Sequence, residues 1–403
     1  MRHMLPFRIP TAARSWFAHT PLALSLCVVG FGVAPAPAEA QARALEEVVV
    51  TARKREESLQ DTPIAITAFS GDQLREAGIS NLADFNKTIP NMEVQAGNGN
   101  AGVANIYIRG VGQRNTEPNL DSGVGIYLDG VYISRADGAL LDVNDLQSVQ
   151  VLRGPQGTLF GKNTTGGALV FTTNRPGPEF ESSVLVRGGN YKRRDAEAMI
   201  NIPLIDDTLY TRLSMVAKKR DGYVHNLFDG QDYNDEDRLS AVWQLRWLPH
   251  DDVVVDFNTN YGKTAQQAHL QKCIEVPEAA ATAWQDRTTN VYVRRANNNK
   301  SIIDFCRESQ ALDTYTVDST GGQYNAENRG FSTTIDWAFA DNISLKSVTG
   351  WRGTRAGQDD PLDAISIPLL TRRNYAHPFA DVRDTDQYSQ EFQLVGDAVE
   401  IRL

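Results

Sequence analysis

The chain has 403 residues, of which 41% are hydrophobic and 22% are charged, and its formal net charge is −10. That length accommodates two or three ordinary domains, and the acidic balance argues against nucleic acid as a partner. Beyond the N-terminus no apolar run is long enough for a transmembrane helix, whereas strands that cross a membrane alternate in polarity and keep the mean hydropathy low.

Residues 1–40 have the features of a secretory signal peptide. Arg2, Arg8 and Arg14 supply a positive n-region, residues 22–33 form an apolar h-region, and residues 38–40 (AEA) fit a cleavage site. The h-region is too short to span a bilayer. We therefore expect an exported protein.

A short extended stretch follows the signal. It comprises Leu45, Glu46, Glu47, Val48, Val49, Val50, Thr51 and Ala52. Its β-branched centre favours extended backbone, and an apolar strand near a free terminus suits capture by the sheet edge of a partner. The alternative is that it forms the first strand of the domain that follows.

Residues 58–177 mix short helices and strands and are rich in glycine, so we expect an α+β domain. Residues 70–73 form a capping box that opens a helix ending near Gly78, and Ser80 is expected to cap a second helix through Phe85. Strands are expected at residues 63–69, 106–109, 125–129, 148–152 and 168–173.

From residue 178 onward, apolar and polar residues alternate with a period of two. The pattern is clear at residues 209–215, 239–247, 253–261 and 331–339, and it predicts antiparallel strands with one apolar and one polar face. A soluble β-sandwich would show the same alternation. Two further features favour transmembrane strands: short turns alternate with long polar loops, and aromatic residues lie near strand ends on the apolar face. These aromatic residues are Trp247, Tyr261, Phe339 and Trp351.

The strand number also carries information. We expect about eight strands of ~9–11 residues each, with the start of a ninth at residues 400–403. A barrel of about eight strands is filled by its own side chains and has no room for a domain of this size. We therefore expect the chain to be the N-terminal part of a larger barrel.

Three motifs resemble the plug domain of TonB-dependent outer-membrane receptors. They are residues 106–112 (IYIRGVG), residues 125–132 (GIYLDGVY) and residues 149–176, which begin VQVLRGPQGTLFG. Their order and spacing match that family. The residues that carry the motifs are Arg109, Gly110, Asp129, Gly130, Arg153, Gly154, Pro155, Gly157 and Gly161, which we assign to plug architecture. As a further hypothesis, Arg109 and Arg153 pair with carboxylates of the barrel wall.

This resemblance implies an α+β plug domain (residues 58–177) followed by antiparallel transmembrane β-barrel strands (residues 178–403). Residues 41–57 then hold a TonB box at residues 45–52, which contacts the TonB protein of the inner-membrane energy-transducing complex. The implied place is the outer membrane of a Gram-negative cell, in contact with its lipid. The implied activity is energy-dependent uptake of a large scarce ligand, most often a ferric siderophore.

The sequence contains no G-x-S-x-G or H-E-x-x-H motif and no catalytic constellation, so we expect neither an enzyme nor a cofactor. No metal-ligand spacing accompanies the cysteines. Cys273 and Cys306 lie in one long polar region, and we expect a disulfide in an oxidising compartment, with two free thiols as the alternative. Two other classes stay open: a secreted β-rich binding protein, and a truncated receptor without transport activity.

Overall fold

In the computed structural model the chain divides into two compact units, residues 1–46 and residues 47–403. The structure describes residues 49–50, 57–58, 64–79, 81–97, 100–113, 120–134, 145–226, 230–267, 307, 310, 315–316, 323–340, 342–359 and 381–396. The predicted signal peptide, the predicted Cys273–Cys306 pair and the predicted strand at residues 400–403 lie outside these residues.

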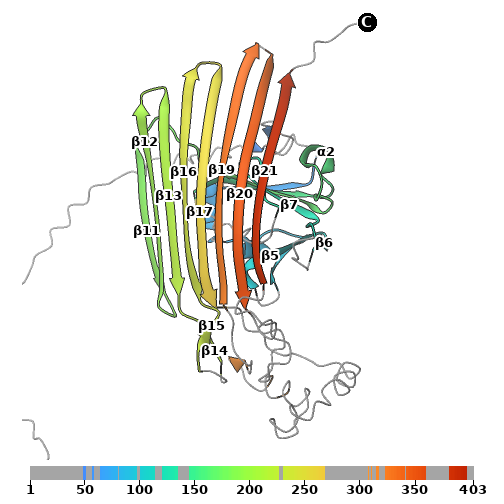
Figure 1. Ribbon diagram of the computed structural model, residues 1–403, viewed down its shortest axis with the longest axis vertical. Coiled ribbons are helices and arrows are strands. Elements are labelled where there is room, and N and C mark those ends of the chain that lie inside the picture. Colours follow the sequence, from blue (N-terminus) through green and yellow to red (C-terminus); the bar gives the residue numbers. More distant parts are fainter. Residues whose placement is uncertain are drawn as a thin grey trace, which may run out of the picture. The chain divides into compact units, whose positions relative to one another are not determined.

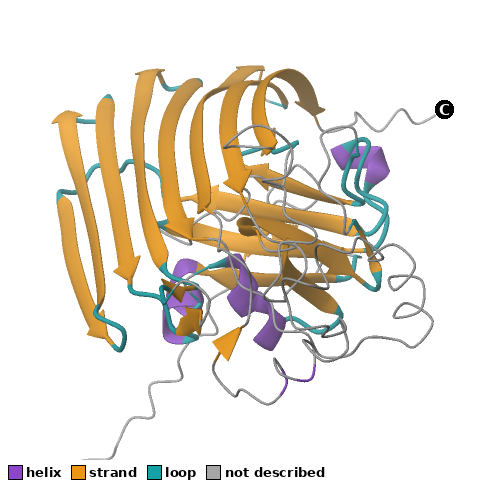
Figure 2. Ribbon diagram, turned by 60° about the horizontal axis from the view of Figure 1, so that its bottom comes forward, coloured by secondary structure: helices purple, strands orange, loops and turns teal. Residues whose placement is uncertain are grey.

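The N-terminal domain, which we define as the described residues between 64 and 176, has two short helices after its first strand (helices are purple in Figure 2). Helix α1 (Gly71–Glu76) has the predicted capping box: Ser70 accepts from the backbone N–H of Gln73, and the Gln73 side chain accepts from that of Ser70. The second helix is the 3-10 helix η1 (Leu82–Lys87).

The residue that caps η1 is Asn81, so the prediction of Ser80 was wrong by one position. The Asn81 side chain accepts from the backbone N–H of Ala83, and the Asp84 side chain accepts from that of Asn81. The physical reason is that a capping box needs a side-chain acceptor at the cap and another three residues later. Asn81 and Asp84 satisfy that spacing, whereas alanine stands three residues after Ser80.

The main sheet of the N-terminal domain has five strands in the order β3-β9-β10-β7-β8. Their bounds are β3 (Ile66–Ser70), β7 (Val124–Leu128), β8 (Val131–Tyr132), β9 (Leu146–Arg153) and β10 (Gly167–Thr173). Strands β9 and β10, both expected from the sequence, form an antiparallel hairpin with the short helix α2 (Gly157–Phe160) in its loop. A second sheet joins β4 (Met92–Gly97), which was not predicted, to β5 (Asn100–Ile108) and β6 (Val111–Gly112).

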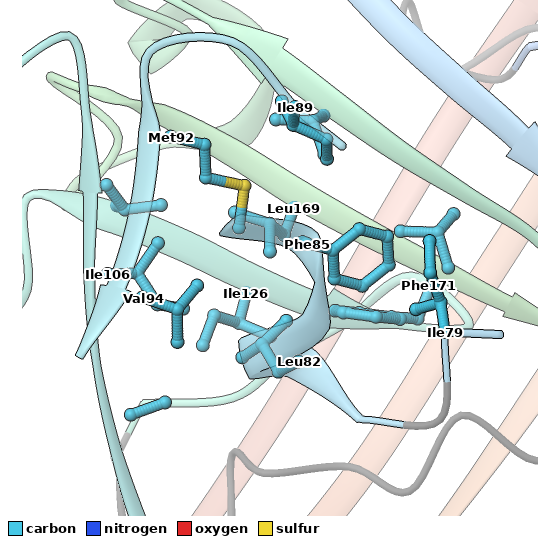
Figure 3. Packing of buried hydrophobic residues seen from close by; sticks show 14 of the residues in the cluster. Ile79, Leu82, Phe85, Ile89, Met92, Val94, Ile106, Ile126, Leu169 and Phe171 are labelled. Atoms are coloured by element: carbon cyan, nitrogen blue, oxygen red, sulfur yellow. The ribbon is translucent and has the colours of Figure 1, made fainter. Parts of the chain in front are cut away.

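One hydrophobic core holds these sheets and helices together. Phe85 of η1, Ile106 of β5 and Leu169 and Phe171 of β10 all belong to one cluster of buried residues, and Figure 3 shows their side chains pointing toward one another. Phe85 and Phe171 are fully buried. Burial of each such side chain stabilises the fold by roughly 1.5–3 kcal/mol, so this core fixes the position of the turns at the edges of the sheets.

The second part of unit 2 is an eight-stranded antiparallel sheet, here called the wall sheet, whose strands follow one another in chain order (Figure 1). Its strands are β11 (Glu181–Gly189), β12 (Arg193–Ile205), β13 (Leu209–Arg220), β16 (Glu236–His250), β17 (Val253–Gln267), β19 (Gln323–Ala340), β20 (Ile343–Asp359) and β21 (Asp381–Gly396). Among the described residues, β11 and β21 are its two edges and the sheet does not close.

The wall strands are longer than expected. Strand β19 has 18 residues and β20 has 17, against the predicted ~9–11. The expected length was the length that a strand needs to cross a bilayer. The pairing between β19 and β20 continues beyond that length, from Gln323 with Asp359 to Ala340 with Ile343.

The predicted alternation of the wall strands is confirmed. On the outer face, Trp243 and Trp337 are 44% and 47% exposed, whereas on the inner face Gln244 is 5% exposed. The apolar side chains are therefore the exposed ones and the polar side chains are covered. This inversion of the usual pattern of a protein in water leaves an exposed apolar face of the kind that contacts a membrane or another protein.

Three short strands lie in the connections between wall strands and were not predicted. They are β14 (Val224–Asn226), β15 (Asp232–Tyr233) and β18 (Tyr315–Thr316), and β14 pairs with both of the others. The small sheet therefore joins two connections that are far apart in the sequence. None of the described helices has both the length and the apolar character that a membrane crossing requires.

Candidate functional site

Two of the three motifs form two-residue hairpin turns. Arg109 and Gly110, with φ of 52° and 78°, connect β5 to β6, and Asp129 and Gly130, with φ of 49° and 82°, connect β7 to β8. Two consecutive positive φ angles define the type I′ turn, which favours glycine at its second position. Both motifs contain the sequence signal for such a turn, because Arg109-Gly110 and Asp129-Gly130 each place glycine second between two strands.

The third motif crosses the β9–β10 hairpin. Gly154 has φ of 101° and donates its N–H to the carbonyl oxygen of Gly166 over 2.9 Å, and Gly161 ends α2 with φ of 80°. Gly167 has φ of 151°, and a Cβ atom there would lie 2.2 Å from the carbonyl oxygen of Leu152. Only glycine fits this close approach of two strands.

The Asp129 turn contacts the inner face of the wall sheet. Its carboxylate accepts from the N–H and the hydroxyl of Thr173, over 2.9 and 3.0 Å, and from the side-chain amide of Asn258 on β17 over 3.0 Å. Thr173 in turn accepts from the side-chain amide of Gln244 on β16 over 2.7 Å. Burial raises the pKa of Asp129, although Thr173 and the nearby positive charges of Arg175 and Arg352 act in the opposite direction.

The strand after this turn is held by β20 and β21. The side chain of Gln387 donates to the carbonyl oxygen of Tyr132 over 2.6 Å and accepts from the N–H of Ser134 over 3.1 Å. A Cβ atom at Gly350 would lie 2.7 and 2.8 Å from the two Cγ atoms of Val131. Val131 therefore fills a space that the absence of a side chain at Gly350 creates.

Two ion pairs connect the N-terminal domain to the wall sheet elsewhere. Asp145, just before β9, accepts two hydrogen bonds from Arg212 of β13, each over 2.7 Å. Arg175, after β10, donates to Asp256 of β17 over 2.8 Å. Bidentate arginine–carboxylate pairs are directional, so the Asp145 contact fixes orientation as well as distance.

The hypothesis that Arg109 and Arg153 pair with wall carboxylates stays a prediction for the part of the chain that the structure describes. Neither residue has an ion pair there, whereas Arg212 and Arg175 do. Arg109 occupies the exposed β5–β6 turn, and the Nε atom of Arg153 is buried without a hydrogen-bond partner. The wall-directed charge of the β7–β8 turn is instead the carboxylate of Asp129, which the motif assignment had treated as architectural.

A cavity of about 320 Å³ lies between the Asp129 turn and the wall sheet. It is lined by Asp129, Arg175, Asp256, Asp336 and Lys346 among others. Within the described residues no group of three or more His, Cys, Asp or Glu side chains is arranged to hold a metal ion. Hydrogen bonds and ion pairs therefore join the N-terminal domain to the wall sheet around this cavity.

Of the predicted partner-binding stretch, residues 45–52, the structure describes only β1 (Val49–Val50), which pairs antiparallel with β2 (Glu57–Ser58). The remaining residues, Leu45 to Val48, Thr51 and Ala52, lie outside the described residues. The predicted extended backbone is present at Val49 and Val50. Its role in binding a partner stays a prediction.

Comparison with known proteins assigns the N-terminal domain. Residues 58–168 match the family model "TonB-dependent Receptor Plug Domain". The chain is a relative of the TonB-dependent receptors, and this segment is its plug domain. We call the N-terminal domain the plug from here on, because the turns described above lie within or directly after the matched residues.

The similarity extends beyond the plug. The pesticin receptor of Yersinia pestis is 26% identical over 331 residues, which cover 81% of this chain and 44% of the receptor. The solved structure of the ferric yersiniabactin uptake receptor FyuA from Yersinia pestis has a TM-score of 0.60 at 17% identity, covering 74% of this chain and 42% of that one.

A further structure, FpvA of P. aeruginosa bound to heterologous pyoverdines, has a TM-score of 0.64 at 14% identity and covers 88% of this chain and 42% of FpvA. At these identities the structural likeness concerns the fold. The chain spans less than half the length of the relatives that it matches.

Proposed function

We propose that this protein is a Gram-negative outer-membrane receptor that takes up a large, scarce ligand with energy supplied through TonB. The observation that carries the proposal is a plug fastened to the polar inner face of a sheet whose outer face is apolar. Such an exposed apolar face is unfavourable in water and favourable in lipid. The match of residues 58–168 to the plug domain of TonB-dependent receptors supports the same proposal.

The outer face has the dimensions of a membrane-crossing band. Tyr261 pairs with Arg329, which lies ten residues before Phe339 on β19. At ~3.4 Å per residue that is about 34 Å along the strand, and a strand tilt of about 40° reduces the height to about 26 Å. Outer-membrane strands present an apolar band about 25 Å tall between two aromatic girdles. Tyr261 and Phe339 mark the two girdles, and outer-membrane lipid is the proposed surrounding.

The ligand class that we propose is a ferric siderophore. The two solved structures compared above are a ferric yersiniabactin uptake receptor and a complex of FpvA with pyoverdine and iron. In this proposal the iron complex is cargo and not a resident cofactor of the protein. The large polar connections between wall strands, which β14 and β18 join, are the proposed place of first contact.

Residues 45–52 are the proposed contact for the TonB protein. Val49 and Val50 are already extended, and among the described residues they pair with Ser58 and Glu57. A short strand of this kind exposes main-chain groups to the sheet edge of a partner. Replacement of Val49 by proline removes one main-chain donor and should therefore weaken the pairing.

The test is uptake of radioactive iron by a Gram-negative strain that lacks its own siderophore receptors and expresses the full-length protein that contains this chain. A panel of ferric siderophores is offered to the wild-type chain, to Val49→Pro and to Ala42→Pro, the control outside residues 45–52. We expect uptake of at least one complex with the wild type and Ala42→Pro, and loss with Val49→Pro. Equal uptake by all three would contradict the TonB contact, and absence of the wild-type chain from the outer membrane would contradict the function.

We also propose that Cys273 and Cys306 form a disulfide in the exported protein. Both residues follow β17 in the connection to β19. Mass spectrometry of the non-reduced protein after alkylation tests this proposal. Alkylation of either cysteine without prior reduction would contradict it.

A further inference from the structure

Several contacts between the wall sheet and the plug, or the segment that leaves the plug, share one property of register. Asn201, Arg212, Gln244, Asn258, Ser332 and Gly350 come from six successive wall strands, β12, β13, β16, β17, β19 and β20. Each is the direct cross-strand partner of the next. These six residues therefore form a single straight row across the inner face. We call it the seating row.

Five members of the row contact the plug or the segment that leaves it. Arg212 binds Asp145, Gln244 binds Thr173, Asn258 binds Asp129, and Gly350 receives Val131. The side chain of Asn201 accepts from the N–H of Gly177 over 3.1 Å and donates to its carbonyl oxygen over 2.9 Å. All these contacts thus share one cross-strand register of the wall sheet.

Burial supports the row as a built feature. Asn201, Arg212, Gln244, Asn258 and Ser332 are polar and between 1% and 9% exposed. Polar groups at this burial need hydrogen-bond partners; the plug supplies them to Arg212, Gln244 and Asn258, and the segment that leaves the plug supplies them to Asn201. Beyond the row, Gln387 holds the main chain of Tyr132 and Ser134. That contact fixes the strand that Val131 begins.

We propose that the seating row sets the position of the plug along the wall strands. Within the row, Gly350 and Asn258 are positioning residues for the β7–β8 turn of the plug. Because side chains alternate between the two faces, a shift of one residue along a wall strand would turn the row to the outer face. The row therefore accepts the plug in one register only. The positioning role of the row follows from these contacts without reference to transport. Any effect of the row on ligand passage rests on the proposed function.

The row also predicts how the plug is released. The contacts lie side by side in one cross-strand row. A displacement of the plug along the wall strands therefore breaks them together and not one after another. Contacts that break together make release cooperative. A change at any one member should then loosen the β7–β8 turn, even though the plug keeps its own hydrophobic core.

The decisive experiment exchanges size between Gly350 and Val131. Gly350→Ala places a methyl group against both Cγ atoms of Val131, and Val131→Ala removes those two atoms. The control is Gly262→Ala on β17, where a Cβ atom would meet nothing closer than 3.9 Å. Hydrogen–deuterium exchange of the full-length chain in detergent reports the outcome, with the Ser134 amide as the probe because it donates to Gln387.

We expect the Ser134 amide to exchange at least tenfold faster in Gly350→Ala than in the wild type, and at the wild-type rate in Gly262→Ala. The double variant Gly350→Ala with Val131→Ala should recover most of the protection. Wild-type exchange in Gly350→Ala would overturn the proposal, and so would a double variant as unprotected as the single one. If Gly350→Ala does not fold, recovery of folding in the double variant supports the seat, and failure of both overturns it.

A second arm tests the row away from this contact. Asn258→Leu removes the amide that Asp129 accepts, whereas Gln390→Leu on β21 changes an amide whose contacts are with Thr349, Ser347 and Glu391. Faster Ser134 exchange in Asn258→Leu alone is expected, and equal exchange in both would overturn a role for the row. The exchange assay needs neither ligand nor TonB. Absent iron uptake with this exchange pattern would therefore contradict transport and leave the seat standing.

Discussion

Arg212 and Asp145 form a bidentate pair, with Nε and Nη2 of the guanidinium each donating to one carboxylate oxygen over 2.7 Å. Their side chains are only 7% and 9% exposed. Removing one member of a buried pair leaves the other charge without compensation, which costs about 3–5 kcal/mol. This contact is therefore the electrostatic anchor between plug and wall.

The first prediction concerns this anchor. Arg212→Met should destabilise the folded protein by about 3–5 kcal/mol, and adding Asp145→Asn should restore part of the loss because the unpaired charge is removed. Thermal unfolding in detergent measures both. The control is Lys219→Met, whose partner Asp237 is exposed and whose pair contributes at most about 1 kcal/mol. Equal losses for Arg212→Met and Lys219→Met would contradict the anchor.

The second prediction concerns the close approach at Gly167. Gly167→Ala should destabilise the plug severely, since the positive φ alone costs about 1–3 kcal/mol and the added Cβ atom would lie 2.2 Å from the Leu152 carbonyl oxygen. Gly177→Ala, where a Cβ atom meets nothing within 4 Å, is the matched control. The rate of limited proteolysis of the plug compares the two. A plug as resistant in Gly167→Ala as in Gly177→Ala would show that the β9–β10 contact tolerates a side chain.

The third prediction is a pH dependence set by Asp129. Its pKa is raised in the folded protein, mainly by burial, so the folded state holds the proton more tightly than the unfolded state. The resulting stabilisation is fully present below the unfolded pKa of about 3.9 and is lost as the pH rises through the raised pKa. The melting temperature of the wild type should therefore fall as the pH rises through this range.

Asp129→Asn removes the titrating group and keeps a residue that tolerates positive φ. Its melting temperature should change less across the same pH range than that of the wild type. Asp251→Asn, at the exposed β16–β17 turn, is the control and should follow the wild type. A variant Asp129→Asn with the full wild-type slope would assign the pH dependence to another group.

The fourth prediction tests the lipid-facing surface. Ile335 lies on the outer face of β19, between the levels of Tyr261 and Phe339, and is 40% exposed. Ile335→Lys should cost about 2–4 kcal/mol at the middle of a bilayer and reduce the amount of protein in the outer membrane. Asp251→Lys, in a turn between wall strands, should leave that amount unchanged. Comparable yields for the two variants would argue that lipid does not cover this face.

The sequence by itself determined the local features of this protein. The α1 capping box, the β9–β10 hairpin and the alternation along each wall strand depend on residues close together in the chain, so their patterns are readable without a structure. The three motifs indicated a plug domain through their resemblance, in order and spacing, to the TonB-dependent receptor family. The error at Ser80 and the missed strand β4 show the limit of such patterns when neighbouring residues have similar propensities.

Only the tertiary structure decided which residues join plug and wall. Asp129 and Asn258 are 129 residues apart, and Tyr132 and Gln387 are 255 apart. No local propensity relates residues at such separations. The seating row depends on the register of every pair of adjacent wall strands, and register is set by cooperative main-chain pairing across the whole sheet. For the same reason a glycine such as Gly350, ordinary in its own strand, gains its role only when Val131 is placed against it.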